Sequence, residues 1–323
     1  MSKSVIIILG GIMAKVVKRK LKIKWKNFII FIIIVIAILL LLIKGTTLLI
    51  DTIKTKLNEP PKTKEETKKK EKPKKQEKTE LELKYEKLNN INKEIDYFRE
   101  ENIDRYIKYK EEHPELDIKK VIINVNIGLD LKPYDDAVPA TNLNKINILV
   151  NKYNYLDKNY VPDNLEKVSS TYALNNMKLV NTAKDAYEQM AKDAAKSNMK
   201  LVIMSSYRSY DYQVDLYNRY AKKDGKDKAD TYSGRPGFSE HQTGLAFDVY
   251  NGKVDYTKFE TTKEFNWMQE NAYKYGFILR FPKDKELETG YIYESWHYRY
   301  VGQDMAKEIK ESNICLEEYM AMH

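Results

Sequence analysis

Cysteine is almost missing from this sequence of 323 residues, in which Cys315 is the single example. An intramolecular disulfide is therefore excluded, but exported domains without disulfides are common, so this count does not decide the compartment. Histidine is also scarce, with four residues in the chain. A site that needs imidazole groups has few candidates, so a histidine within a motif is informative.

Acidic residues are absent from residues 3–26, a segment that contains eight lysine or arginine residues. This segment accounts for most of the formal net charge of +9. The rest of the chain carries mixed charge, which is not typical of a surface that binds a phosphate backbone. We therefore expect no nucleic-acid partner.

Polar residues are absent from residues 28–43, and the apolar run resumes after Gly45 as far as Ile50. About 20 apolar residues span the hydrocarbon core of a bilayer. No small-residue cleavage site follows the run, which favours an uncleaved anchor over a signal peptide. The basic residues before it predict a cytoplasmic tail at 1–27, a membrane span at 28–50 and an extracellular location for all that follows.

Apolar residues are few in the next segment, residues 51–84, which is rich in Lys, Glu, Thr and Pro. Such a composition cannot bury a core and predicts a disordered, charged stalk. Apolar residues at steps of three and four between 81 and 113 then predict a helix that Pro114 limits. We assign residues 85–120 to a helical lead-in.

Residues 121–323 are expected to form one domain. The β-branched run at 121–128 and the shorter run at 146–151 both predict extended structure. We expect further strands at 201–207, 243–250, 277–281 and 298–301, helices at 178–198, 210–223, 262–275 and 303–312, and a mobile loop at 224–237. Because most strands come late in the chain, we predict an α+β fold with flanking helices and a small antiparallel sheet that carries the site.

Two short motifs hold the chemistry of this domain. His241 and Asp248 lie seven residues apart, and Glu294 and His297 lie three apart further along. Two histidines and one aspartate supply three ligands and leave a fourth tetrahedral position open, as a catalytic zinc ion requires. Glu294 then remains as a carboxylate next to a ligand, and we interpret the set as a zinc hydrolase site. A hydrogen-bonded structural pair of His241 and Asp248 is the alternative.

The spacing of the second motif makes a geometric demand. Residues three apart in a regular strand point to opposite faces. Glu294 and His297 can approach one metal ion together only if the chain turns between them. We therefore expect a turn or a bulge at 294–296.

Three segments of the domain carry a family resemblance. Residues 205–209 read Ser-Ser-Tyr-Arg-Ser, residues 239–248 read Ser-Glu-His-Gln-Thr-Gly-Leu-Ala-Phe-Asp, and residues 293–298 read Tyr-Glu-Ser-Trp-His-Tyr. Together they closely resemble the VanY-type D-alanyl-D-alanine carboxypeptidases, in the wider lysostaphin, D-Ala-D-Ala and hedgehog group of zinc peptidases. The resemblance runs from about Ile103 to the C-terminus and leaves the predicted anchor and stalk outside.

The resemblance implies a role for each matching residue. His241, Asp248 and His297 match the zinc ligands, and Glu294 matches the catalytic base. Arg208, Gln213 and Ser239 match residues that hold the terminal carboxylate of the substrate or the carbonyl oxygen under attack. For Arg208, a structural ion pair with Asp211 or Asp215 is the alternative. Two departures from the family are Phe281, where relatives often have tyrosine, and Ser295, where many have proline.

These observations predict a membrane-anchored, monomeric zinc D,D-carboxypeptidase. It would remove the terminal D-alanine from peptidoglycan stem peptides outside the cell. An L,D-carboxypeptidase that acts on tetrapeptides is one alternative. A non-catalytic module that binds the cell wall and keeps zinc for structural reasons is another, but such a module has no need for Glu294 or Arg208.

Overall fold

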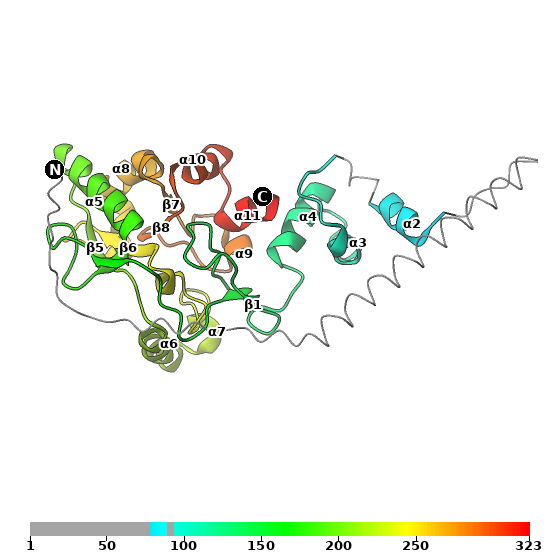
Figure 1. The fold of residues 1–323 in the computed structure, drawn as a ribbon, viewed down its shortest axis with the longest axis horizontal. Coiled ribbons are helices and arrows are strands. Elements are labelled where there is room, and N and C mark those ends of the chain that lie inside the picture. The colour runs from blue at the N-terminus through cyan, green and yellow to red at the C-terminus, as the bar shows by residue number, and fades with distance from the viewer. Residues whose placement is uncertain (1–77, 89–93) are drawn as a thin grey trace, which may run out of the picture. The chain divides into compact units, whose positions relative to one another are not determined.

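The computed structural model describes residues 78–88 and 94–323 (Figure 1). The predicted tail at 1–27, the predicted span at 28–50 and the predicted stalk up to residue 77 lie outside these residues. Across the described ranges, no helix combines the length and the apolar character needed to cross a bilayer. The end of the predicted stalk is helical, because α2 (Glu80–Lys87) begins there behind a capping box on Thr79.

The predicted helix at 81–113 is interrupted. It is represented by α2, a single 3₁₀ turn η2 (Glu100–Asn102) and α3 (Ile103–Glu112). The last of these ends at His113, next to Pro114, as the sequence predicts. Their apolar side chains form a separate small core that includes Leu88, Ile95 and Tyr106.

The strand predicted at 121–128 is wrong, because these residues belong to helix α4 (Ile118–Ile127). Asp117 caps the helix by accepting a hydrogen bond of 3.0 Å from the backbone N–H of Lys120. Gly128 ends it with a φ of +100°, a conformation that glycine adopts without strain. The β-branched run is helical because one of its faces packs against α3 and another against α11 (Leu316–Met322). The boundary drawn between residues 120 and 121 therefore lies inside α4.

The central sheet has four antiparallel strands in the order β5-β6-β8-β7. Their bounds are β5 (Val202–Ser205), β6 (Ala246–Tyr250), β7 (Phe277–Leu279) and β8 (His297–Tyr300). This confirms the predicted α+β class with a small antiparallel sheet. Two short ladders lie outside it: β1 (Val138–Pro139) pairs with β2 (Asn154–Tyr155), and β3 (Leu165–Lys167) pairs with β4 (Lys178–Val180). The predicted piece at 146–151 forms no strand and contributes an isolated bridge at Asn151.

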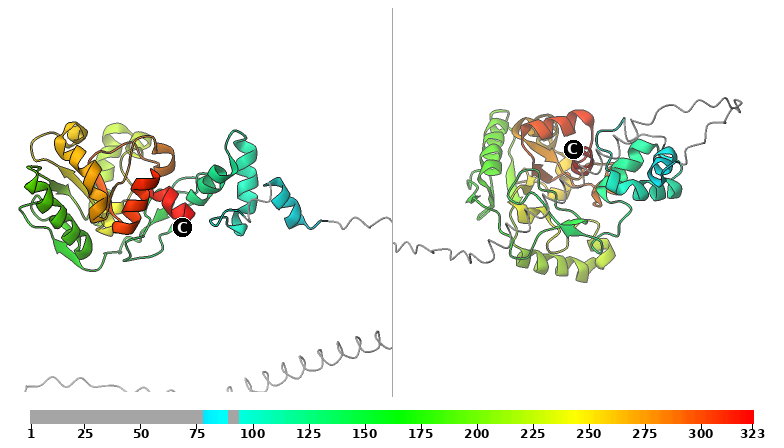
Figure 2. Two further views of the ribbon diagram at one scale, coloured as in Figure 1. Left: turned by 90° about the horizontal axis from the view of Figure 1, so that it is seen from above. Right: turned by 45° about the vertical axis from the view of Figure 1, so that its right-hand side comes forward.

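Helices flank the sheet on both sides. Figure 1 shows α5 (Asn181–Lys196), α8 (Lys263–Asn271) and α10 (Gln303–Ser312) on one side, and α6 (Tyr210–Asp224) on the other. Figure 2 shows the same arrangement from above. These four helices agree with the predicted ones, except that residues 178–180 form β4 and a 3₁₀ turn, η5 (Ala272–Tyr275), follows α8.

The main core lies between the sheet and α5. Phe247 and Val249 of β6 are completely buried there, together with Tyr187 and Met190 of α5. Side chains alternate along a strand. Asp248, between the two apolar residues of β6, therefore points to the opposite face of the sheet, where the site lies.

Several short elements were not predicted. They are α7 (Lys226–Ala229), η3 (Glu240–Thr243), η4 (Tyr256–Thr261), α9 (Glu286–Thr289) and α11. The predicted loop at 224–237 contains α7 and is held by several side-chain contacts, to α6 as well as within the segment. Arg235 Nη2 lies 2.7 Å from Asp230 Oδ2, and the Tyr232 hydroxyl donates to Asp224 at 2.7 Å.

Candidate functional site

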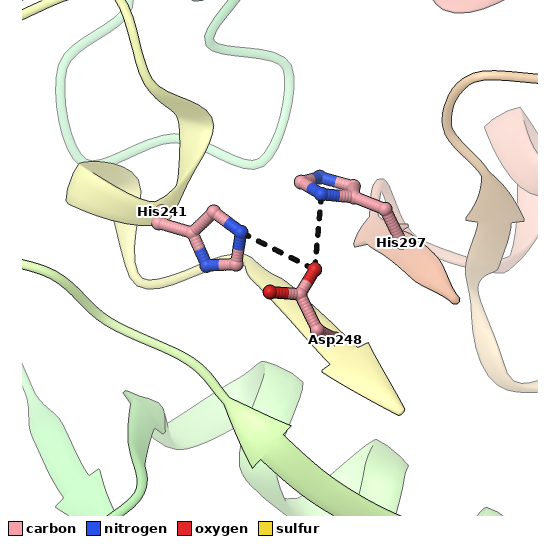
Figure 3. Close-up of side chains that lie close together, drawn as sticks. All are labelled: His241, Asp248 and His297. Carbon is pink, nitrogen blue, oxygen red and sulfur yellow. Dashed lines mark ion pairs between the residues drawn. The ribbon is translucent and has the colours of Figure 1, made fainter. Parts of the chain in front are cut away.

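Two of the candidate ligands are opposite each other in the sheet. Asp248 of β6 pairs in register with His297 of β8, and with Ser205 of β5 on its other side. Paired positions on neighbouring strands direct their side chains to the same face. The His297 Nδ1 atom consequently lies 3.2 Å from Asp248 Oδ1 (Figure 3).

The third candidate ligand reaches the same point through a sharp turn. His241 lies in η3, and Gly244 ends this turn with a φ of +67°, which redirects the chain into β6. The turn is tight, since a Cβ atom on Gly244 would lie 2.9 Å from Leu165 Cδ2. It brings His241 Nε2 to 3.4 Å from Asp248 Oδ1 (Figure 3).

The ring of His241 is oriented from behind. Its Nδ1 atom lies 2.8 Å from the backbone carbonyl oxygen of Ser206. A carbonyl only accepts, so Nδ1 carries the proton and Nε2 presents its lone pair to Asp248. Burial, with Arg208 adding to it, lowers the pKa of His241 to about 4. The imidazole is therefore neutral at pH 7, the form in which it binds a metal.

These three side chains fit a zinc ion. One ligand atom from each of His241, Asp248 and His297 lies within 4.8 Å of the other two, and all three residues are buried. Among the residues described, Asp248 Oδ1 has no hydrogen-bond partner, although it is completely enclosed. A buried carboxylate oxygen left unpartnered between two imidazoles is a costly arrangement unless a cation completes it. Two imidazole nitrogens and one carboxylate oxygen form a donor set typical of catalytic zinc.

Glu294 stands beside this trio. The chain turns at residues 295–296, with the His297 N–H donating to the Glu294 carbonyl at 3.4 Å, which meets the geometric demand of the sequence. Glu294 Oε2 lies 3.6 Å from His297 Nδ1. Burial raises the pKa of the Glu294 carboxyl to about 8, although positive charge on His297 opposes the shift. A carboxylate with a pKa near neutrality is suited to both accepting and returning a proton.

Arg208 pairs with a candidate ligand. Its Nη2 atom lies 2.7 Å from Asp248 Oδ2, and the Ser205 hydroxyl oxygen accepts from its Nε and Nη2 atoms at 3.0 and 2.8 Å. In the described part of the chain, no ion pair forms with Asp211 or Asp215. Arg208 also lines the cleft in front of the trio, so it contacts both the ligand and the space that a substrate would occupy.

Ser239 and Gln213 occupy different positions. Ser239 lines the same cleft. Gln213 is buried behind it: its amide nitrogen donates to the Gly234 carbonyl at 2.7 Å, and its amide oxygen accepts from Arg208 Nη1 at 3.4 Å. Gln213 therefore contacts both Arg208 and the 224–237 segment, and its contact with substrate stays a prediction.

The cleft itself has a volume of about 550 Å³. Glu294, the candidate ligands and Arg208 lie along it, and aromatic side chains form part of its wall. These side chains come from α6 and from the segments around 256 and 296; the Tyr256 and Trp296 rings meet edge to face at 5.0 Å. The cleft can receive an extended peptide end.

Next to His297 lies a buried charged cluster that was not predicted from the sequence. Glu240 Oε1 accepts from Arg280 Nε at 2.8 Å and from Arg299 Nη1 at 2.9 Å. The sequence does contain a sign of this cluster, because Arg280 and Arg299 each interrupt a predicted apolar strand segment. Charged residues are seldom fully buried without a partner, so two such arginines indicate a buried acid nearby.

A buried cluster of two histidines and an aspartate, with a carboxylate beside it in an open cleft, is an arrangement typical of metal-dependent hydrolases. Comparison with known proteins identifies the family to which the chain belongs. Residues 176–303 match the family model described as VanY: D-alanyl-D-alanine carboxypeptidase. The chain belongs to this family and is a peptidase.

Three relatives illustrate the similarity. The Bacillus subtilis (strain 168) protein YodJ, whose name assigns it to the carboxypeptidases, is 40% identical over 203 residues, which cover 59% of this chain and 72% of YodJ. A D-alanyl-D-alanine carboxypeptidase of Enterococcus faecium is 37% identical over 181 residues, covering 55% of this chain and 50% of that enzyme. The solved structure of the LD-carboxypeptidase LdcB has 39% sequence identity and a TM-score of 0.55, over 59% of this chain and 92% of that one.

Proposed function

We propose that this protein is a zinc carboxypeptidase that removes the terminal D-alanine from peptidoglycan stem peptides. The observation that carries the proposal is the buried trio of His241, Asp248 and His297, with Glu294 beside it at the wall of an open cleft. The substrate class is supported by the relatives, one of which is named a D-alanyl-D-alanine carboxypeptidase.

Zinc would be held by His241 Nε2, Asp248 Oδ1 and His297 Nδ1, the atoms that face one another. When bound, the ion supplies a Lewis acid that acidifies water and polarises the peptide carbonyl. The Ser206 carbonyl behind His241 fixes the orientation of that ring, as outer partners of metal ligands commonly do.

Glu294 is the general base of this proposal. It accepts the proton of the attacking water and then returns it to the amine of the leaving D-alanine. Both transfers need a carboxyl whose pKa lies near the working pH, and burial raises the pKa of Glu294 to about 8. The 295–296 turn holds this carboxylate on the cleft side of His297.

Arg208 and Ser239 are the groups that would meet the substrate. The Arg208 guanidinium places a fixed positive charge at the cleft wall, close to where negative charge develops on the attacked carbonyl oxygen. The Ser239 hydroxyl can donate to the terminal carboxylate. Gln213 acts indirectly by bracing Arg208.

An L,D-carboxypeptidase is a second candidate, because the solved LdcB structure, at 39% identity, is that of an LD-carboxypeptidase. The two candidates differ in whether the residue before the scissile bond is a D- or an L-amino acid. Mass spectrometry after incubation with a defined pentapeptide and a defined tetrapeptide separates them. Loss of one alanine from the pentapeptide supports the first, loss from the tetrapeptide alone supports the second, and loss from neither contradicts both.

We also propose that residues 28–50 anchor the protein in the membrane, with residues 1–27 in the cytoplasm and the catalytic domain outside. The uninterrupted apolar run and the basic residues before it support this proposal. An extracellular domain would also have direct access to peptidoglycan.

A further inference from the structure

We propose that Glu240 is a positioning residue of the metal site, which holds the proton of His297 on Nε2, and that the C-terminal helix α11 keeps Glu240 in place through Glu317. This inference rests on the proposed zinc site and extends it to charged groups beyond the three candidate ligands, Glu294 and Arg208. The groups involved are the ring of His297 and four buried charged side chains, those of Glu240, Arg280, Arg299 and Glu317.

The two ring nitrogens of His297 face two different carboxylates. Its Nδ1 atom faces Asp248, at 3.2 Å from Oδ1. An imidazole that offers the lone pair of Nδ1 to a metal must carry its proton on Nε2. In this ring, Nε2 faces the carboxylate of Glu240, at 3.6 Å from Oε2.

His297 Nε2 and Glu240 Oε2 are both polar atoms that need a hydrogen-bond partner. Within residues 78–88 and 94–323, neither His297 Nε2 nor Glu240 Oε2 has a hydrogen-bond partner, and both are buried. A buried donor and a buried acceptor that face each other across 3.6 Å are each other's available partner. Metal-bound histidines commonly direct their second N–H to a carboxylate in this way, which fixes the tautomer and strengthens the ligand.

Glu240 can remain ionised in the interior because two arginines compensate its charge. Its other oxygen, Oε1, accepts hydrogen bonds from both Arg280 and Arg299. Arg299 is anchored in turn, since its Nη2 atom donates to the carbonyls of Ile146 and Ile148 at 2.9 and 2.7 Å. The carboxylate is therefore clamped on one side and free to face His297 on the other.

The C-terminal helix α11 contributes a further residue to this cluster. Glu317 of α11 forms a two-point ion pair with Arg280, with Nη1–Oε2 and Nη2–Oε1 distances of 2.8 and 2.5 Å. The side chains of Glu240, Arg280, Arg299 and Glu317 have exposed fractions of 2% or less. Two cations and two anions balance, so removing one member leaves an uncompensated charge in the interior behind the metal ligand. α11 also packs on α4, which links the N-terminal helices to this cluster.

The first experiment uses the intact chain. With histidine rings labelled by ¹⁵N, NMR of the zinc-loaded protein reports which nitrogen of each ring carries a proton. The four histidines give few signals. We expect opposite tautomers for the two metal-binding rings: a proton on Nδ1 of His241, toward the Ser206 carbonyl, and a proton on Nε2 of His297, in slow exchange with water. The tautomer of His297 follows from zinc binding at Nδ1, so the exchange rate of its Nε2 proton tests Glu240: rapid exchange with water, as expected of an N–H without a partner, would overturn the proposal.

The second experiment measures the zinc dissociation constant by competition with a chelator. Glu240→Gln should weaken zinc binding by about 10- to 100-fold, the usual cost of losing an outer partner. Glu317→Gln leaves Glu240 in place and should weaken it by a smaller factor. Glu288→Gln is the matched control: Glu288 is also buried and paired, with Lys120 at 2.7 Å, but it is not part of this cluster, and zinc binding should not change.

The outcomes are distinguishable from failure of the proposed function. Unchanged zinc affinity in a folded Glu240→Gln protein would reject the positioning role while leaving the zinc site standing. Absence of zinc binding by the unaltered protein would instead reject the proposed function. If Glu240→Gln does not fold, the exchange rate of the His297 Nε2 proton and the Glu317→Gln affinity decide. Equal loss of affinity in Glu288→Gln would assign the effect to general destabilisation.

Discussion

Arg208 and Asp248 form a partly buried ion pair in which Nη2 of the arginine lies 2.7 Å from Oδ2 of the aspartate. The other oxygen of this carboxylate, Oδ1, faces His241 and His297. The two oxygens of Asp248 therefore have separate partners: one faces the metal position and the other a cation. This division gives Arg208 a double role, because it orients a ligand and also exposes positive charge to the cleft.

Replacing Arg208 tests that role. Arg208→Lys keeps a charge but loses the planar fork that binds Asp248 and Ser205 at once. We expect kcat/KM to fall by about 100- to 1000-fold, the range for losing a preorganised electrostatic donor. Arg219→Lys, an exposed change on helix α6, which begins two residues after Arg208, is the control. Near-normal turnover in Arg208→Lys would mean that charge alone, without the fork, is sufficient.

Glu294→Gln should separate chemistry from metal binding. The amide has the size of the carboxylate but cannot accept the proton of water. We expect kcat to fall by about two orders of magnitude or more. KM should change far less, because the lost interaction belongs to the transition state. Elemental analysis should find the same zinc content as in the unaltered protein, and activity that survives this change would remove Glu294 from the role of base.

His297→Ala should behave differently, because it removes a ligand. We expect loss of zinc together with activity in this variant. For the unaltered protein, we expect about one zinc ion per chain, loss of activity with a strong chelator and recovery when zinc is returned. A chelated protein that keeps full activity would contradict the metal assignment, and so would a His297→Ala protein with a full complement of zinc.

Asp230 makes stability depend on pH. Burial is the largest single influence and opposes its ionisation, but the hydrogen bonds from Arg235 and Tyr217 and the charges of Arg235 and Lys152 together outweigh burial and hold the pKa of Asp230 below its ordinary value of 3.8. A depressed pKa in the folded state stabilises the fold at pH values above the unfolded pKa, and this stabilisation is lost as pH falls through the folded pKa. Asp230→Asn should therefore lower the free energy of unfolding at pH 7, by on the order of 1 kcal/mol for a partly exposed pair.

The same comparison at low pH checks the sign. Urea unfolding at pH 7 and at pH 3 should give a smaller difference between Asp230→Asn and the unaltered protein at the lower pH. Asp211→Asn, an exposed change on α6, controls for the loss of a charge. A difference that grows toward low pH would contradict the assignment.

The proposed topology can be tested on intact cells. Residues 54–78 are rich in lysine, and trypsin added from outside should cut there and release a soluble, active fragment. Digestion only after lysis would reverse the orientation. Cells that express the chain without residues 1–50 serve as the control, since in them the catalytic domain has no anchor to be released from.

Much of the site could be predicted from the sequence because its parts are local. The His241–Asp248 and Glu294–His297 spacings each lie within one short segment, and the need for a turn after Glu294 follows from strand geometry alone. The four strands of the central sheet and the helices beside them were also predictable, since their apolar patterns are local and strong.

Other features depended on partners far away in the chain. The 121–128 run has the composition of a strand, yet it is a helix, because α3 and α11 give its apolar residues a helical surface to pack against. The resemblance predicts substrate contact for Gln213, but its neighbours come from the tertiary fold: residues 233–234 place a hydroxyl and a carbonyl on its amide nitrogen, and Arg208 donates to its amide oxygen.

The sequence by itself determined which residues can bind a metal and move a proton, because those properties belong to side chains and to short spacings. Tertiary structure alone decided how the charges are paired. Glu240, Arg280 and Glu317 are separated by 40 and 37 residues, and no local pattern joins them. They meet because η3, the end of β7 and α11 converge behind His297, where water is excluded and each buried charge requires an opposite one.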